Sequence, residues 1–294
     1  MADADKDGAR SVIVISSHVA RGSVGNRAAV FALETLGFPV WAVPTVILPW
    51  HPGHGRATRI VPEAEQFAAF LKDMEGSPRL SEVGAVLSGY LGDARQAEAI
   101  ASLVRKLRLV NPDARYVCDP VVGDAGGLYV AQSTAEAIRD DLVPLADIAT
   151  PNRFELEWMT GRPLAELDDV IAVASALGPR MMLVTSAAGL SSGRIGNLLV
   201  TGASATLAEH GVIDKPPNGP GDLMAAVFLA RLMQGLDSAK ALQLATASVF
   251  EILARAKKRG ADELMLETDA ASLSEPAAMV NLKHLSYPEP DRRA

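Results

Sequence analysis

The chain has 294 residues, of which 49% are hydrophobic and 21% charged; this excludes a wholly disordered protein and allows a sizeable apolar core. The formal net charge of −7 argues against general nucleic-acid binding, because such proteins usually present a basic face. Cys118 is the only cysteine, so no internal disulfide forms, which fits a reducing cytoplasm. No charge-free apolar run approaches the ~18–20 residues that cross a bilayer, so no membrane association is expected.

Short apolar stretches recur along the chain and predict buried β-strands. They lie at 11–16, 40–48, 83–87, 115–118, 147–149 and 181–185, and alternating stretches at 194–200 and 205–210 predict antiparallel strands. Pro44 lies within the second stretch and indicates a break or a sheet edge.

Helical segments follow most of these strands. They are predicted at about 27–36, 63–74, 93–110, 134–142, 155–160, 167–177, 223–235 and 238–258, with 123–127 as a loop. Asp93 is a candidate N-cap, and Asn152 with Glu155 forms a candidate capping box. The alternation favours one α/β domain over 11–286, with a mostly parallel sheet and helices on both faces. Residues 1–10 are expected to be a disordered tail and 287–294 a frayed one.

Polar side chains gather where the predicted strands end, and ligands of parallel sheets bind beyond those carboxyl ends. These residues are Ser17, Thr45, Tyr90, Asp119, Asn152 and Thr185. The first three could offer hydroxyls and an aromatic face to a small heteroaromatic substrate, although each alone also suits an ordinary loop. Their distribution predicts one cleft.

The stretch Gly219-Pro220-Gly221-Asp222 precedes the strongly apolar LMAAVFLARLM and predicts an anion site at a helix start. Glycine permits a sharp turn, and the first amides of a helix have no intrahelical partner. Asp222 could accept a proton from an alcohol, although its position near the helix N-terminus predicts a low pKa. A plain turn followed by a helix cap would use the same residues.

Two further carboxylates are candidates for holding magnesium. Asp119 ends a strand, where it could bind Mg²⁺ or simply make an Asp-Pro turn. Glu155 could lie beside the phosphates and also complete the capping box, and the two roles are compatible.

The loop 49–55, with the sequence PWHPGHG, carries aromatic and imidazole groups. His51 and His54 lack convincing zinc spacing, and the lone cysteine adds no metal-ligand pattern. The composition favours a flexible cover rather than a metal site.

Seven segments in order resemble the pyridoxal kinases of the ribokinase-like superfamily, over about Val12 to Leu266. They are SHVARGSVGNRAAV (17–30), LGFPVWAVPTV (36–46), LSGYLG (87–92), YVCDPVVGD (116–124), TPNRFELE (150–157), VTSAAG (184–189) and GPGD (219–222). The resemblance implies a ribokinase-like fold and phosphorylation of the 5′-hydroxyl of pyridoxal by ATP, with pyridoxine and pyridoxamine as further acceptors. It also implies Mg²⁺, often with a monovalent cation such as K⁺, and a homodimer.

The resemblance also implies individual roles. Asp222 matches the catalytic base, and Gly219 and Gly221 match anion-hole glycines. The positions that match contacts to the vitamin are Ser17, Thr45, Tyr90 and Asp222. The positions that match the nucleotide side are Asp119, Tyr129, Asn152, Glu155, Thr185, Ser186, Gly219 and Gly221, with Asp119 and Glu155 near magnesium.

Two departures from the family pattern bear on these roles. Pro220 has no amide hydrogen, so at most the amides of Gly221 and Asp222 supplement that of Gly219. The loop 49–55 also differs from the common pattern. The alternatives are a hydroxymethylpyrimidine kinase of the same fold and a non-catalytic protein that binds pyridoxal phosphate, the latter favoured only by Pro220.

Overall fold

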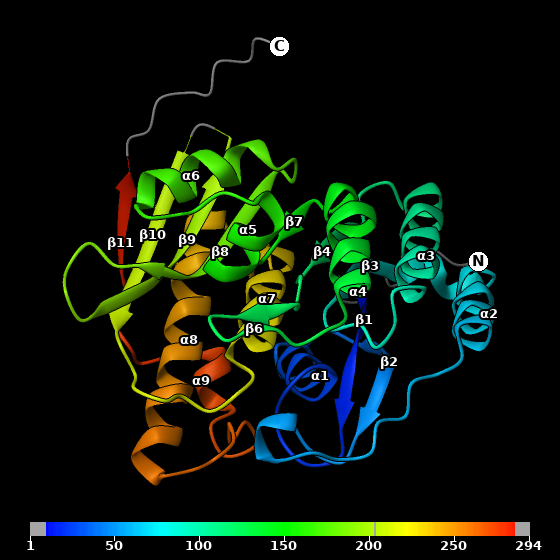
Figure 1. Ribbon diagram of the computed structural model, residues 1–294, viewed down its shortest axis with the longest axis horizontal. Helices are drawn as coiled ribbons and strands as arrows, with labels where there is room; N and C mark the ends of the chain where they lie inside the picture. The colour runs from blue at the N-terminus through cyan, green and yellow to red at the C-terminus, as the bar shows by residue number, and fades with distance from the viewer. Residues whose placement is uncertain (1–9, 203, 286–294) are drawn as a thin grey trace, which may run out of the picture.

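The computed structural model describes residues 10–202 and 204–285 (Figure 1). The tail predicted for 287–294 lies outside these ranges, as does the tail predicted for 1–10 apart from Arg10. The strands of the main sheet are β1 (Ser11–Val19), β2 (Val40–Leu48), β3 (Val83–Ser88), β4 (Arg115–Cys118), β7 (Ile148–Ala149), β8 (Met181–Ala188), β9 (Arg194–Thr201), β10 (Ser204–Gly211) and β11 (Asn281–Leu285).

These strands form a nine-stranded sheet in the order β11-β10-β9-β8-β7-β4-β3-β1-β2. Within this order, the neighbouring strands β8, β7, β4, β3, β1 and β2 pair in parallel. Strand β9 pairs antiparallel with β8, and β10 and β11 continue the antiparallel pairing. The predicted mostly parallel sheet and its antiparallel pair are therefore confirmed. Strand β2 is an edge strand, which explains how it accommodates Pro44.

The helices are α1 (Asn26–Thr35), α2 (Ala64–Glu75), α3 (Gln96–Val110), α4 (Gln132–Ala137), α5 (Arg153–Thr160), α6 (Leu167–Ala176), α7 (Pro220–Met233), α8 (Ser238–Arg259) and α9 (Ala271–Ser274). They cover both faces of the sheet, as successive residues of one strand show. Val12 and Val14 of β1 pack with α1, α7 and α8, whereas Ile13 and Ile15 pack with α2 and α3. Strand β1 reads as a continuous apolar run because both of its faces are buried.

Helix α7 lies at the centre of the first layer. Its residues Leu223 to Ala230 are at most 2% exposed, since the sheet, α1 and α8 surround it. A helix that is apolar all round is a buried core helix. The run LMAAVFLARLM thus fixes the position of the turn that precedes it.

Some local predictions were wrong. Asp93 does not cap α3, because the helix begins at Gln96, whose side-chain oxygen accepts the amides of Gly92 (2.9 Å) and Asp93 (3.3 Å). The loop 123–127 instead carries two short paired strands, β5 (Gly123–Asp124) and β6 (Gly127–Leu128). The helix predicted for 134–142 ends early, and 138–142 forms a wider π turn.

Helix α7 begins at Pro220, two residues before Asp222, where the helix was expected to begin. Proline suits the first helical position, since its missing amide hydrogen would have no partner there. Among the described helices, none has the length and hydropathy to cross a bilayer.

A buried ion pair ties the segment after α8 to that helix. Asp269 is fully buried and accepts hydrogen bonds from Arg259 at 2.5 and 2.8 Å. The guanidinium of Arg259 lowers the pKa of Asp269 below its usual value. The pair therefore stabilises the folded protein above the ordinary aspartate pKa, and this stabilisation is lost as the pH falls through the lower folded-state pKa.

We expect Asp269→Asn to lower the free energy of unfolding by about 2 kcal/mol at pH 7, because it leaves Arg259 without its buried counter-charge. The difference from the unmodified protein should shrink below about pH 4, as the carboxyl group protonates. Urea unfolding at a series of pH values measures both effects. Asp140→Asn, which changes an exposed ion pair with Arg139, is the control. Equal losses in the two variants would contradict the expectation.

Candidate active site

The site lies at the carboxyl edge of the sheet, where the strand order reverses. Strand β1 has β2 on one side and β3 on the other, and crevices at such switch points are where open α/β sheets bind ligands. A cavity of about 10 Å³, room for about one water molecule, opens there. Its polar lining consists of Ser16, Asp119 and Asp222, with Gly25 and Gly89 beside them.

The turn before α7 is built by Gly219, which adopts a left-handed conformation (φ 97°, ψ 2°). A side chain at this position would clash with the carbonyl oxygen of Ser23, so only glycine fits. The amide of Asp222 bonds its own carboxylate, and that of Leu223 donates to Gly219 O (3.1 Å). The amide of Gly221 therefore remains as the anion donor within the first turn.

Gly221 faces open space. It is exposed, and a Cβ added to it would meet no atom within 4 Å. Gly221 lies in the first turn of α7, where the positive end of the helix dipole attracts an anion. The glycine thus keeps the approach to the helix N-terminus clear for a phosphate.

Asp222 lies half-buried in the first turn of α7 and faces the cavity. Burial raises the pKa of Asp222 to about 6. Hydrogen bonds from the backbone amides of Gly25 and of Asp222 itself act in the opposite direction and lower this pKa, but by less. The predicted low pKa was therefore wrong, because loss of solvent outweighs the helix dipole here. A carboxylate with this pKa is ionised at neutral pH and is a stronger base than an exposed aspartate.

Asp119 follows β4 and lines the same cavity. Thr150 donates its hydroxyl to Asp119 Oδ1 (2.7 Å), and burial together with the charge of Asp222 raises the pKa of Asp119 to about 7. Two carboxylates thus face one small recess, and no lysine or arginine lines it in the described part of the chain. This donor set suits a cation that would neutralise their charge.

Magnesium fits such a recess, because it usually takes one or two carboxylates and fills its other positions with water and substrate phosphates. Within residues 10–202 and 204–285, no group of three or more His, Cys, Asp or Glu side chains is placed to hold a metal. Protein carboxylates alone would therefore not complete the coordination shell.

Asn152 and Glu155 form the predicted capping box of α5. The buried Glu155 also accepts the amides of Val122 (3.0 Å) and Gly123 (3.5 Å), while Asn152 Nδ2 donates to Gly123 O (2.8 Å). Burial, reinforced by the charge of Asp119, raises the pKa of Glu155 well above its usual value. Both residues hold the base of the β5–β6 hairpin, and Tyr129 follows this hairpin with 49% of its surface exposed.

Thr185 and Ser186 form a bulge in β8 opposite Asn197 of β9. Ser186 has a left-handed backbone (φ 55°) and is exposed, and the amide of Thr185 donates to Pro151 O (2.9 Å). Bulges re-aim side chains next to sites. This one brings the end of β8 beside Asn152.

A second bulge lies at the other end of the crevice, in β2 opposite Ser17. Thr45 in this bulge is fully buried and donates its hydroxyl to Tyr90 O (2.7 Å). Tyr90 is half-buried and its hydroxyl accepts from Arg59 Nη2 (3.1 Å). The structure thus groups Ser17, Thr45 and Tyr90, and it turns the Thr45 hydroxyl toward Tyr90 O.

Four residues near the site were missed. Ser16 Oγ accepts the amide of Tyr90 (3.1 Å), and Arg59 reaches the Tyr90 hydroxyl. A side chain at Gly89 would collide with Ser16 Oγ (2.6 Å), and one at Gly25 would collide with Ser17. The GSVGN and SGYLG segments drew attention to these glycines, but their neighbours across the crevice became evident only from the fold.

One crevice of the parallel sheet holds an acidic residue at a helix start, an open amide beside it and a second carboxylate. This arrangement is that of a small-molecule kinase of the ribokinase-like fold. Sequence comparison agrees, since the model of the phosphomethylpyrimidine kinase family matches residues 57–266. The pyridoxal kinase PdxY of Rubrobacter xylanophilus is 40% identical over 277 residues, covering 92% of this chain and 95% of the relative. PdxY of Granulibacter bethesdensis is 39% identical over 265 residues, covering 87% and 93%.

Solved structures agree as well. Pyridoxal kinase from Leishmania donovani, in complex with ADP and pyridoxamine, superposes with a TM-score of 0.88 at 27% identity, covering 94% of this chain and 99% of that one. The chain therefore belongs to the pyridoxal kinase family.

We expect Asp222→Asn to stabilise the ligand-free protein at pH 8. The folded-state pKa of Asp222 lies above its ordinary value, so ionisation destabilises the fold as the pH rises through about 6 and has no effect below about 4. The gain in unfolding free energy should be about 1 kcal/mol, less than the full pKa shift implies, because the residue is partly exposed. Urea unfolding at pH 8 and pH 4 tests this, and an equal change at both pH values would contradict it.

Proposed function

We propose that this chain transfers the terminal phosphoryl group of ATP to the 5′-hydroxymethyl group of pyridoxal, giving pyridoxal 5′-phosphate in vitamin B6 salvage. The observation that carries the proposal is the Asp222 carboxylate beside the open Gly221 amide, in one recess with Asp119. The curated relatives named as pyridoxal kinases support the acceptor. The complexes of the Leishmania enzyme with ADP and pyridoxamine or pyridoxine support the nucleotide and the wider acceptor range.

In this proposal Asp222 orients the hydroxymethyl oxygen and accepts its proton while the oxygen attacks the terminal phosphorus in line with the leaving group. The amides of Gly219 and Gly221 and the positive end of α7 stabilise the charge on the transferring group. The pKa of about 6 keeps Asp222 ionised at neutral pH and still basic enough to accept the proton.

The acceptor side lies around Ser17, Thr45 and Tyr90. We place the pyridine ring against the Tyr90 ring, which packs on a small apolar cluster formed by Val19, Val24, Val46 and Leu48. Thr45 supports Tyr90 through its hydroxyl, and Ser17 lines the ring edge.

The nucleotide side lies around Asn152, Thr185 and Ser186, with Tyr129 directly after the hairpin that would cover ATP. We propose that Asp119, with Glu155 behind it, holds Mg²⁺, which offsets the charge of the phosphates when it is bound. One domain over 11–286 is proposed from the continuous nine-stranded main sheet. A K⁺ activator and a homodimer rest on the family resemblance, and a cytoplasmic location also fits the lone, buried Cys118.

We expect Asp222→Asn to lower turnover by ~100-fold or more, because it removes the proton acceptor and leaves the shape of the recess intact. The dissociation constant for pyridoxal should change by less than about threefold, because the contacts that bind pyridoxal before the reaction are largely retained. A coupled ADP-release assay and a fluorescence titration measure the two quantities. Near-normal turnover would refute the assignment of the base.

We expect Asp119→Asn to raise the Mg²⁺ concentration for half-maximal turnover by about tenfold, since one anionic oxygen ligand is lost. Asp113→Asn is the matched control, because Asp113 is exposed and precedes β4, at the opposite end of that strand from Asp119. Turnover is measured against Mg²⁺ at saturating ATP. An unchanged Mg²⁺ dependence in Asp119→Asn, or an equal shift in both variants, would exclude the proposed site.

One screen distinguishes the proposed function from its two rivals, a hydroxymethylpyrimidine kinase and a non-catalytic protein that binds pyridoxal phosphate. Hydroxymethyl heterocycles are incubated with ATP and Mg²⁺, and phosphorylated products are detected by mass spectrometry. We expect pyridoxal to be phosphorylated at least tenfold faster than hydroxymethylpyrimidine, because Tyr90 and its apolar cluster favour the pyridine ring. Preference for the pyrimidine would favour the first rival, and no product from any heterocycle would favour a non-catalytic binding protein.

A further inference from the structure

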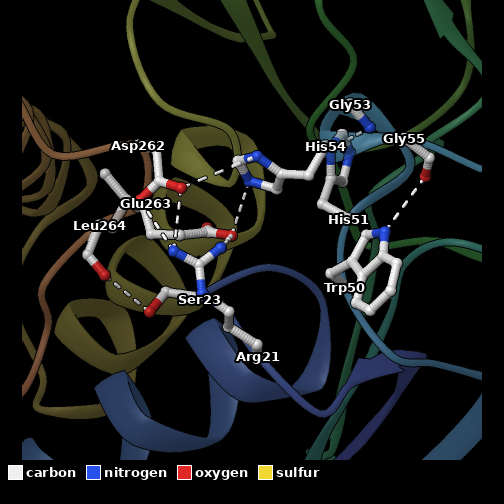
Figure 2. A network of polar contacts seen from close by, with 10 residues as sticks. All are labelled: Arg21, Ser23, Trp50, His51, Gly53, His54, Gly55, Asp262, Glu263 and Leu264. Carbon is white, nitrogen blue, oxygen red and sulfur yellow. Dashed lines mark hydrogen bonds and ion pairs between the residues drawn. The ribbon is translucent and has the colours of Figure 1, made fainter.

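A network of polar contacts joins three segments beside the site (Figure 2). The segments are the loop 20–25 after β1, the loop 49–55 after β2, and residues 262–264 after α8. Glu263 lies at the centre of this network and is 8% exposed, whereas its neighbour Asp262 has a 60% exposed side chain. A buried carboxylate needs partners, and those of Glu263 come from the two loops.

The first partner comes from the loop 49–55. His54 Nε2 lies 2.8 Å from Glu263 Oε1. The loop itself is a tight turn, since Gly53 donates to His51 Nδ1 (3.1 Å), His54 to His51 O (2.9 Å) and Trp50 Nε1 to Gly55 O (3.2 Å). His54 is thus the side chain through which a folded turn reaches Glu263, as Figure 2 shows.

The second partner comes from the loop 20–25. Arg21 Nη1 lies 3.6 Å from Glu263 Oε1, and a Cβ added to Gly22 (φ 109°) would lie only 2.5 Å from the same oxygen. Ser23 donates its hydroxyl to Leu264 O (2.8 Å). The loop therefore packs directly on residues 263–264.

Both loops also contact residues at or next to the turn that begins α7. The carbonyl oxygen of Ser23 lies against Gly219, and the amide of Gly25 bonds the Asp222 carboxylate. Gly53 lies against Asn218, since a Cβ there would be 3.1 Å from Asn218 Nδ2. The loop 49–55 thus spans from β2, which carries Thr45, to the turn that begins the anion site.

We propose that Glu263 is a positioning residue which, through His54, holds the loop 49–55 closed over the acceptor side of the site. This inference rests on the proposed function, and it assigns Glu263 no contact with substrate. Loss of the contact frees the loop 49–55, while the Ser23–Leu264 hydrogen bond keeps the loop 20–25 and Asp222 in place. Pyridoxal binding therefore weakens more than the chemical step slows.

The kinetic test compares Glu263→Ala, His54→Ala and the double variant. We expect each single variant to raise KM for pyridoxal about tenfold, with kcat and KM for ATP within about threefold of the unmodified enzyme. The double variant should match the more affected single variant, because both substitutions remove the same contact between His54 and Glu263. Glu267→Ala is the control, since Glu267 is exposed in the same segment and makes none of the contacts of this network, so it should leave all constants unchanged.

The structural test needs no activity. Hydrogen exchange of peptides that cover 49–55 should accelerate at least tenfold in Glu263→Ala and in His54→Ala, and stay unchanged in Glu267→Ala. Because the His54 side chain is 23% exposed, His54→Ala tests the contact even where Glu263→Ala fails to fold. Unchanged exchange, additive effects in the double variant, or a loss confined to kcat would overturn the inference. If the unmodified protein phosphorylates no pyridoxal, the proposed function fails, and exchange alone then decides on the contact.

Discussion

The arrangement of the site depends on how the Asp222 carboxylate is held at the head of α7. The helix dipole and two amides favour its charge, whereas burial in the crevice opposes it, and burial prevails. The same crevice brings Asp119 near enough for its pKa to respond to that charge. The protein thus keeps two acidic groups close together without a basic side chain in the cavity lining, an arrangement that suits a ligand bringing both metal and phosphate.

The sheet shapes the site through irregularities within two of its strands. A bulge in β2 faces Ser17, and a bulge in β8 contains Thr185 and Ser186. The regular part of β8 is largely buried, whereas β2 is a partly exposed edge strand, and in both strands the bulge interrupts the ladder pairing and redirects side chains. One bulge lies on the proposed acceptor side and the other on the proposed nucleotide side.

Much of the fold could be predicted from the sequence, because hydrophobic residues recur with a different period in the strands than in the amphipathic helices. The capping box of Asn152 and Glu155 was also predictable, since it depends on residues three apart. The raised pKa of Asp222 was not, because desolvation depends on chain segments far away in the sequence. Likewise the contact of His54 with Glu263 joins residues 209 positions apart, and no local pattern indicates it. Gln96 replaced Asp93 at the start of α3 for a related reason: its side chain also reaches Thr45 O in a distant strand.

The burial of α7 beyond its first turn separates a rigid part of the molecule from parts that can adapt. Enclosed by the sheet, α1 and α8, this helix cannot slide or tilt without opening the core, so the proposed base and anion donors form a fixed reference frame. Any adjustment to a differently shaped acceptor must then come from the surface loops. Variation in those loops would alter which alcohols are accepted while the phosphoryl-transfer geometry stays constant, and substrate range could therefore diverge among relatives without disturbing the hydrophobic interior.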